Sequence, residues 1–165
     1  MGILNLMHDK IDTQKRFYKV LPNAELTFLY PRSHYQNRPV SAEVAAISEP
    51  LYISRINEFD GFIITGAPND HLAFKDVEYI EEIRCLPQEL DRQRKQQLYF
   101  CWGAIAAMNY FYGIKKRILA EKIFGIFPHL IIEPHPLLMG LAKDLSLHML
   151  AMQKWIKNRS CKIHA

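Results

Sequence analysis

Short apolar runs alternate with helical patterns over most of the chain. The runs have the length and the apolar, β-branched and aromatic content of buried strands, and they cover residues 3–7, 25–30, 60–65 and 97–101. Segments in which apolar residues recur every three or four positions predict helices at about 13–21, 41–49, 77–86 and 102–112. Strands that alternate with helices form a parallel sheet with helices on both faces. The pattern therefore predicts an α/β fold.

The pattern is less regular after Gly113. Residues 121–124 are ambiguous between helix and strand, and residues 130–132 have the composition of a short strand. Prolines argue against one long regular element here, because proline lacks the N–H that helices and sheet ladders use; they are Pro128, Pro134 and Pro136. The sequence contains no internal repeat and no low-complexity tract. We therefore expect a single domain with an irregular final part.

Length and composition are those of one soluble globular domain, since the chain has 165 residues, of which 49% are apolar. No apolar run approaches the roughly 18 residues of a membrane span, and the N-terminus lacks the charge pattern of a signal peptide. The odd number and wide spacing of Cys85, Cys101 and Cys161 suit a reducing compartment. We expect a cytoplasmic protein with no membrane partner.

The formal net charge of +4 raises the question of a nucleic-acid partner. The whole excess lies in the segment from Lys143 onward, and the rest of the chain is balanced. A balanced body with a short basic tail argues against a surface that follows phosphates, so no nucleic-acid partner is expected. Cys161 and His164 form at most half of a metal site, so no metal is expected either.

Cys101 stands where a predicted strand meets a predicted helix. Gly103 and Ala104 add little bulk to the bend, which is the arrangement of a nucleophile elbow. A thiol there points out at the carboxyl edge of the sheet, and the N-terminus of the helix favours its thiolate form. The N–H of Trp102 has no acceptor within the helix and is available to an oxyanion. The alternative is a buried core cysteine.

Blocks of sequence on both sides of Cys101 carry a family resemblance. They are residues 3–11 (ILNLMHDKI), 59–68 (FDGFIITGAP), 100–104 (FCWGA), 121–127 (EKIFGIF) and 135–138 (HPLL). In this order they resemble the homoserine O-succinyltransferase and O-acetyltransferase family of methionine biosynthesis, over about residues 3–140. The resemblance implies a fold similar to class I glutamine amidotransferases, which is a flavodoxin-like parallel sheet with helices on both faces. This agrees with the alternation of strands and helices.

The resemblance implies acyl-transfer chemistry at Cys101. In the family the elbow cysteine takes an acyl group from acyl-CoA as a thioester and passes it to the hydroxyl of homoserine. This implies no bound cofactor, with acetyl-CoA as a co-substrate, and it assigns the backbone N–H of Trp102 to the oxyanion. Lys122, in the EK block, would contact the substrate. The alternative for Lys122 is a solvated surface lysine.

Asp70 lies two positions after the segment Gly66-Ala67-Pro68, which we call the GAP loop. The resemblance connects this position with the choice of acyl donor. In the family a glycine there accompanies succinyl transfer and a glutamate accompanies acetyl transfer. A carboxylate repels the free carboxylate of a succinyl group and occupies its space, so Asp70 favours an acetyl donor. The alternative is a loop aspartate that only stabilises a turn.

The sequence departs from the family near its end. The family's catalytic base is a histidine in a late GHPEY-like motif, paired with its glutamate, and that motif does not occur here. From about His148 onward we find no match to the family. We therefore expect an incomplete acyltransferase-like domain at 1–147, with its C-terminal part missing, and a divergent basic tail at 148–165 produced by a frameshift or premature stop. Loop histidines such as His129 and His135 are usually structural and are not expected to replace the base.

Several functions stay open from the sequence. The first is transfer of acetyl from acetyl-CoA through Cys101 to L-homoserine, by an enzyme that is active or recently inactivated. Homoserine O-succinyltransferase and serine O-acetyltransferase are related alternatives, since one methylene separates the two acceptors. A glutaminase-type amidohydrolase would also use Cys101, but the CWGA and EK blocks resemble the transferases more closely. The last alternative is a non-catalytic remnant or interaction module. Small molecules are the expected partners, and the choice between monomer and homodimer is open.

Overall fold

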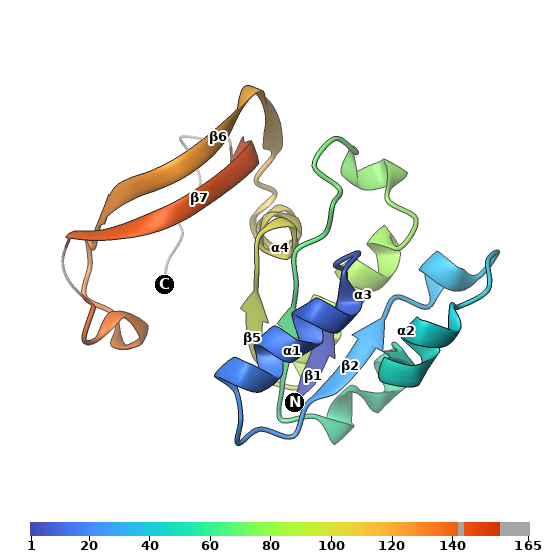
Figure 1. The fold of residues 1–165 in the computed structure, drawn as a ribbon. Coiled ribbons are helices and arrows are strands. Elements are labelled where there is room, and N and C mark those ends of the chain that lie inside the picture. The colour runs from blue at the N-terminus through green and yellow to red at the C-terminus, as the bar shows by residue number, and fades with distance from the viewer. Residues whose placement is uncertain (142–143, 156–165) are drawn as a thin grey trace. The chain divides into compact units, whose positions relative to one another are not determined.

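The computed structural model describes residues 1–141 and 144–155, which belong to two compact units (Figure 1). The first unit is Met1–Lys115, and the second begins at Lys116. The first contains a five-stranded sheet with helices, and the second contains a two-stranded sheet. None of the helices in these ranges is long and apolar enough to cross a membrane.

A parallel sheet forms the centre of the first unit. Its strands are β1 (Gly2–Leu4), β2 (Thr27–Tyr30), β3 (Glu49–Pro50), β4 (Gly61–Ile64) and β5 (Gln96–Tyr99). They lie in the order β3-β2-β1-β4-β5, and every neighbouring pair is parallel. Parallel neighbours need long crossover connections, which the intervening helical segments provide. The predicted α/β fold is confirmed, although the two-residue strand β3 has no counterpart in the sequence pattern.

Helices connect the strands and cover both faces of the sheet. They are α1 (Lys10–Val20), α2 (Ala42–Ile47), α3 (Ile80–Arg92) and α4 (Trp102–Tyr112). α1 begins after Asp9, whose carboxylate accepts a hydrogen bond from the N–H of Asp12 at 3.1 Å. α4 ends at Gly113, which has a left-handed φ of +63°. Each helix overlaps a segment for which the apolar periodicity predicts one.

Side chains of the sheet alternate between two buried apolar clusters. The larger cluster joins three strands to α3 and α4, and it includes Leu4, Leu29, Ile64, Leu86 and Trp102. The smaller cluster contains Ile3, Phe28 and Ile63, with Phe17 and Leu21 packed against it. The period-two alternation of a strand places neighbouring residues on opposite faces, so α1 covers one face and α3 with α4 the other. Figure 1 shows α1 crossing one face of the sheet.

The second unit is a long antiparallel hairpin of β6 (Lys116–Leu130) and β7 (Asp144–Trp155). This corrects the sequence prediction, in which prolines prevent a long regular element. Pro128 lies inside β6, opposite Ser146. Both strands of a two-stranded sheet are edge strands, where a proline is tolerated because its missing N–H can face away from the partner.

The domain boundary predicted at residue 147 falls inside β7. The segment after residue 155 lies outside the described residues. The division into an acyltransferase-like domain at 1–147 and a divergent tail at 148–165 therefore stays a prediction.

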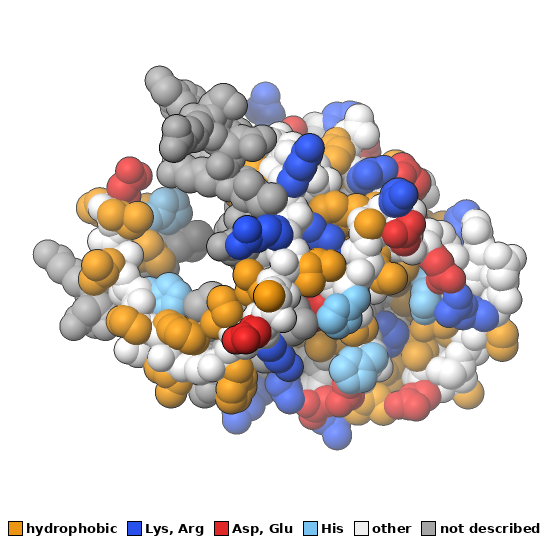
Figure 2. Space-filling view, turned by 90° about the horizontal axis from the view of Figure 1, so that it is seen from above, with side chains coloured by type: hydrophobic (Ala, Val, Ile, Leu, Met, Phe, Trp, Pro, Cys, Tyr) orange, Lys and Arg blue, Asp and Glu red, His pale blue; other side chains and the backbone are white. Residues whose placement is uncertain are grey.

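In the face shown in Figure 2, acidic and basic side chains lie interspersed among apolar ones.

Candidate active site

Two loops meet where β4 and β5 end, at the carboxyl edge of the sheet. Ile64 pairs with Tyr99, and the N–H of Phe100 donates to the carbonyl oxygen of Ile64 at 2.9 Å. The chain then runs from β4 into residues 65–70, and from β5 through Cys101 into α4. Ligands of open α/β sheets bind at this edge. The pairing thus places the GAP loop beside Cys101 and makes this corner the candidate active site.

Cys101 forms a sharp corner between β5 and α4. Its φ of 49° and ψ of −118° lie outside the usual regions for an L-residue, which costs on the order of 1–3 kcal/mol. Its carbonyl oxygen accepts the N–H of Ile105 at 3.1 Å and so begins the helix. The side chain is exposed, which rules out the alternative of a buried core cysteine. The corner has the predicted elbow geometry, and the catalytic role of Cys101 stays a prediction.

Two glycines allow the close packing around this corner. A Cβ at Gly66 would lie 3.0 Å from the Cβ and 3.4 Å from the Sγ of Cys101. A Cβ at Gly103 would lie only 2.6 Å from the carbonyl oxygen of Thr65. Real Cβ atoms essentially never come so close to a backbone oxygen, so α4 can begin directly over the end of β4 only with a glycine at position 103. The GAP loop and the first turn of α4 thus fix the cysteine from two sides.

Trp102 anchors the corner from inside the protein. Its side chain is fully buried, and its ring centroid lies 6.1 Å from that of Phe74 and 6.2 Å from that of Tyr79. The indole Nε1 has no hydrogen-bond partner among the described residues. As the first residue of α4, Trp102 has a backbone N–H without an acceptor inside the helix. The same residue thus offers a core anchor and a backbone donor next to Cys101.

The loop that carries Asp70 is tied to the same core. Asn69 is buried, and its side-chain amide donates to the hydroxyl oxygen of Tyr79 at 2.6 Å. Burial raises the pKa of Tyr79, which keeps the phenol neutral at ordinary pH. Asp70 follows directly and is half-buried. Asp70 therefore lies on a loop held by Tyr79, which also packs against Trp102, and its role in selecting the acyl donor stays a prediction.

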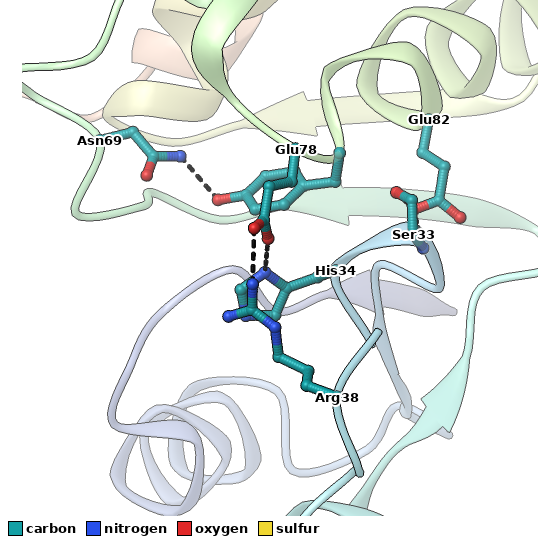
Figure 3. A network of polar contacts seen from close by, with 7 residues as sticks. Ser33, His34, Arg38, Asn69, Glu78 and Glu82 are labelled. Atoms are coloured by element: carbon teal, nitrogen blue, oxygen red, sulfur yellow. Dashed lines mark hydrogen bonds and ion pairs between the residues drawn. The ribbon is translucent and has the colours of Figure 1, made fainter. Parts of the chain in front are cut away.

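A polar network fixes the loop after β2 to the start of α3 (Figure 3). The Glu82 carboxylate accepts hydrogen bonds from the N–H and the Oγ of Ser33, at 3.1 and 2.7 Å. Figure 3 shows the Glu78 carboxylate facing both His34 and Arg38, whose Nδ1 and Nη2 lie 3.0 and 2.5 Å from it. All of these groups are partly exposed, so the Arg38–Glu78 ion pair contributes about 0–1 kcal/mol. The network orders the loop more than it stabilises the fold.

Sequence reasoning missed this network. No motif marks His34 and Glu78, because they lie 44 positions apart in two unrelated loops. The ring of His34 contacts Tyr79 at a centroid distance of 5.7 Å, and Tyr79 in turn contacts Trp102. This histidine–carboxylate pair is thus linked to the residue next to Cys101 through one intervening ring.

Lys10 braces the loop after β1, next to the same edge. Its Nζ donates to the carbonyl oxygens of Asn5 and Met7, at 2.7 and 3.2 Å. Asn5 is fully buried, and its Oδ1 accepts the N–H of Met7 at 3.1 Å. A Cβ at Gly66 would lie 3.7 Å from the sulfur of Met7, so this loop backs the GAP loop. Asn5 and Lys10 belong to the first block of the family resemblance, and the structure gives them this bracing role.

Lys10 makes the stability of the fold depend on pH. Burial lowers the pKa of Lys10 from 10.5 to about 8. Between these two values the unfolded state binds more protons than the folded state at this lysine, so stability rises with pH from about 8 to 10.5. We expect the free energy of unfolding of the wild type to gain about 2 kcal/mol relative to Lys10→Met over this range, after allowance for solvent screening. Urea titrations of both proteins at pH 7, 8.5 and 10 measure this; parallel pH profiles would contradict it.

Lys122 belongs to the second unit. It is exposed and lies in the part of β6 where the pairing with β7 shifts register, between Ile118 and Ile123. The structure brings Cys101, Trp102 and Asp70 into one unit, whereas Lys122 lies in the other. Contact between Lys122 and a substrate at Cys101 therefore stays a prediction.

The remaining histidines and cysteines form no metal cluster within the described ranges. No group of three or more histidine, cysteine, aspartate or glutamate side chains there could hold a metal ion. His129 lies on β6, where its Nδ1 is 2.9 Å from the carbonyl oxygen of Phe127. Cys161 and His164 lie outside the described residues.

A comparison with models of protein families identifies the family of this chain. The model of the homoserine O-succinyltransferase family matches residues 1–156 of this chain. The chain belongs to the homoserine O-succinyltransferase family. The glutaminase-type alternative is therefore set aside. The match also runs past position 148, where the sequence resemblance is lost.

Relatives in the homoserine O-succinyltransferase family are named as acetyltransferases. A protein named serine O-acetyltransferase from Lactobacillus acidophilus is 71% identical over 143 residues, which are 87% of this chain and 55% of that protein. A protein named homoserine O-acetyltransferase from Bacillus subtilis (strain 168) is 37% identical over 137 residues, which are 81% of this chain and 46% of that one. The chain thus spans about half the length of the curated relatives that it matches.

A solved structure confirms the fold of this family member. A protein described as a GMP synthase subunit, from Thermoplasma acidophilum, superposes with a TM-score of 0.64 at 12% sequence identity. The match covers 94% of this chain and 65% of the other. At this identity the likeness concerns the fold alone, and it agrees with the predicted glutamine amidotransferase-like architecture.

Proposed function

We propose that this chain accepts an acetyl group from acetyl-CoA on Cys101 and serves the acetylation of the L-homoserine hydroxyl, with acetyl-CoA as co-substrate and no bound cofactor. The exposed, strained elbow cysteine at the carboxyl edge of the sheet carries this proposal. Membership of an acyltransferase family supports it, as does the name acetyltransferase in the relatives. We place the reaction in the cytoplasm, with small molecules as its partners.

The first half-reaction follows from the groups at the corner. The Cys101 thiolate attacks the carbonyl carbon of acetyl-CoA, and the oxyanion of the tetrahedral intermediate accepts the backbone N–H of Trp102. The C–S bond to coenzyme A then breaks, the coenzyme leaves as a thiolate that takes up a proton, and acetyl remains as a thioester on Sγ. Gly66 packs against one side of Cys101, since a Cβ there would lie 3.4 Å from Sγ.

The second half-reaction needs a base. The acceptor hydroxyl attacks the thioester carbonyl and loses its proton, and the Cys101 thiolate is released. The family resemblance assigns this base to a histidine in a late motif that this sequence lacks. We therefore propose that Cys101 and the backbone N–H of Trp102 suffice for acylation of Cys101. Rapid transfer to the acceptor needs a base that these two residues do not supply. If no transfer to an acceptor occurs at all, the chain is the non-catalytic remnant named above as an alternative.

The donor is proposed to be acetyl because of Asp70. Its half-buried carboxylate follows the loop that packs against Cys101, and it would repel the carboxylate of a succinyl group. Lys122 is proposed to contact the substrate through its ammonium group. Serine is a second candidate acceptor, because a relative with 71% identity is named serine O-acetyltransferase.

Intact-protein mass spectrometry tests the proposed function. The chain is incubated with acetyl-CoA or succinyl-CoA, and then with homoserine or serine. We expect an acetyl adduct that forms from acetyl-CoA at least about tenfold faster than a succinyl adduct from succinyl-CoA, because of the added like-charge repulsion at Asp70. We also expect neither acceptor to discharge the adduct rapidly. A chain that stays unmodified by both donors would overturn the proposal, and fast discharge by one acceptor would show that a base is present and identify that acceptor.

A further inference from the structure

Asn69 fixes the loop after β4 with both its side chain and its backbone. Its side-chain Nδ2 donates to the hydroxyl oxygen of Tyr79 at 2.6 Å, and Figure 3 shows this hydrogen bond. Its carbonyl oxygen accepts the N–H of Leu72 at 3.2 Å, which closes a β-turn from Asn69 to Leu72. Asp70 is the first central residue of this turn. One side chain thus anchors the turn that carries Asp70.

Both partners of the side-chain hydrogen bond are buried. Asn69 is 9% exposed and Tyr79 is 8% exposed. The ring of Tyr79 also packs against fully buried Trp102, the residue after Cys101, at a centroid distance of 6.2 Å. The hydrogen bond therefore attaches the turn to the same core residues that anchor the elbow, and the two parts of the candidate site share one support.

The start of the same loop is fixed independently. The Oγ1 of Thr65 accepts a backbone N–H from the segment after β1 at 2.8 Å and donates to the carbonyl oxygen of Gly66 at 3.0 Å. A Cβ at Gly66 would lie 3.4 Å from the Sγ of Cys101. Asp70 is four positions further along, so its Cα lies within about 14 Å of that of Gly66. The loop is thus held beside the sulfur at one end, and the hydrogen bond to the tyrosine holds the other end directly before Asp70.

A buried polar pair holds this loop where an apolar pair would be as stable. Replacing both partners of a buried hydrogen bond by apolar groups of similar shape is often nearly neutral, whereas removing one partner is costly. What the hydrogen bond adds is a defined geometry for the residues beside it. We infer that Asn69, through its hydrogen bond to Tyr79, is a positioning residue that holds the Asp70 carboxylate where it discriminates between acyl donors. This inference rests on the proposed function, which assigns the preference for acetyl over succinyl to Asp70.

A double-mutant cycle tests this role. Asn69→Leu and Tyr79→Phe remove the same hydrogen bond from its two ends. Each variant should lower the preference for acetyl-CoA over succinyl-CoA at least about threefold, because a carboxylate that is no longer held in place repels the succinyl group less. The ratio of the two adduct rates, from intact-protein mass spectrometry, measures this preference.

The double variant separates positioning from stability. Asn69→Leu/Tyr79→Phe should melt at a higher temperature than either single variant, because neither partner is left buried and unpaired. Its donor preference should stay as low as in the single variants, because the hydrogen bond is still absent. A donor preference that returns together with the stability would show a purely structural role and overturn the inference.

Two further comparisons locate the effect at the carboxylate. In an Asp70→Asn background, Tyr79→Phe should leave the donor preference unchanged, because the charge through which it acts is absent. Tyr30→Phe is the matched control, since it also removes the hydroxyl of a buried tyrosine, whose ring packs against that of Tyr35. It should keep the wild-type preference. An effect of Tyr79→Phe that is as large without the carboxylate, or that Tyr30→Phe reproduces, would overturn the inference.

Hydrogen exchange distinguishes this inference from the proposed function. The N–H of Leu72 donates to the carbonyl oxygen of Asn69, so its exchange reports the order of the turn without any acyl group. We expect Tyr79→Phe to speed the exchange of this amide at least about fivefold and to leave the amides of β1 unchanged. Faster exchange in a chain that takes up neither acyl group would overturn the proposed function and keep Asn69 as the residue that positions Asp70. Unchanged exchange would overturn the inference, whatever the chain does with acyl-CoA.

Discussion

Replacing Cys101 by serine is expected to abolish the acyl adduct, with a loss of at least about a hundredfold in its rate of formation. A hydroxyl is a far weaker nucleophile than a thiolate unless a positioned base removes its proton, and such a base contributes about 10² or more. Serine keeps the size and the strained backbone of the residue, whose φ is 49°. The variant thus changes the chemistry of the corner and leaves its geometry. Intact mass measured over time with acetyl-CoA gives the rate.

Cys85 provides the matched control. It is the other described cysteine, it is also exposed, and it lies on α3. Cys85→Ser should form the adduct at the wild-type rate, because this thiol lacks an adjacent helix N-terminus and the elbow. Adduct formation that survives in Cys101→Ser, or that disappears in Cys85→Ser, would show that acetyl-CoA acylates a different residue.

Trp102→Ala is expected to lower the free energy of unfolding by about 3–5 kcal/mol, the usual cost of removing a large buried aromatic side chain. The tryptophan is fully buried and contacts the rings of Phe74 and Tyr79. Its loss would leave a cavity directly below the elbow. For a domain of ordinary stability this is a large fraction of the total. Urea unfolding followed by far-ultraviolet circular dichroism measures the change without relying on the fluorescence of the residue that is removed.

Trp102→Phe separates packing from polarity at the same position. Phenylalanine retains most of the ring contacts and removes an indole N–H that has no acceptor among the described residues. Because a buried unpaired donor is itself unfavourable, part of the lost packing should be offset, and the variant should lose less than about 1.5 kcal/mol. Equal losses for the alanine and phenylalanine variants would mean that the indole nitrogen, and not the ring volume, holds the corner.

The parallel sheet could be predicted from the sequence because its main strands lie in short runs rich in apolar, β-branched and aromatic residues. The run at 60–65, for example, contains β4, and every residue of β4 is buried. The hairpin of the second unit could not be predicted in the same way. Residues of β6 are exposed or only half-buried on both faces, so they show no clean apolar and polar alternation. Its pairing with β7 joins Lys116 to Trp155, a contact that local periodicity does not report.

The candidate site was predictable at one position and hidden at the others. The elbow at Cys101 follows from a strand that runs into a helix, and that pattern is local. The left-handed φ of Cys101 and the 2.6 Å limit at Gly103 are properties of packing between β4 and α4, which a sequence does not display. The link from Asn69 to Tyr79 likewise needs the folded loops. Long-range contacts therefore account for what sequence reasoning could not reach.

The register shift in β6 separates the two halves of the hairpin. Ile118 lies opposite Gln153 and Ile123 lies opposite Ala151, so the segment 119–122 faces a single position of β7. A segment this irregular can gain or lose a residue while the pairing from Ile123 onward keeps its register. An insertion or deletion beside Lys122 would thus move this lysine along β6 and leave the pairing of the rest of the hairpin unchanged.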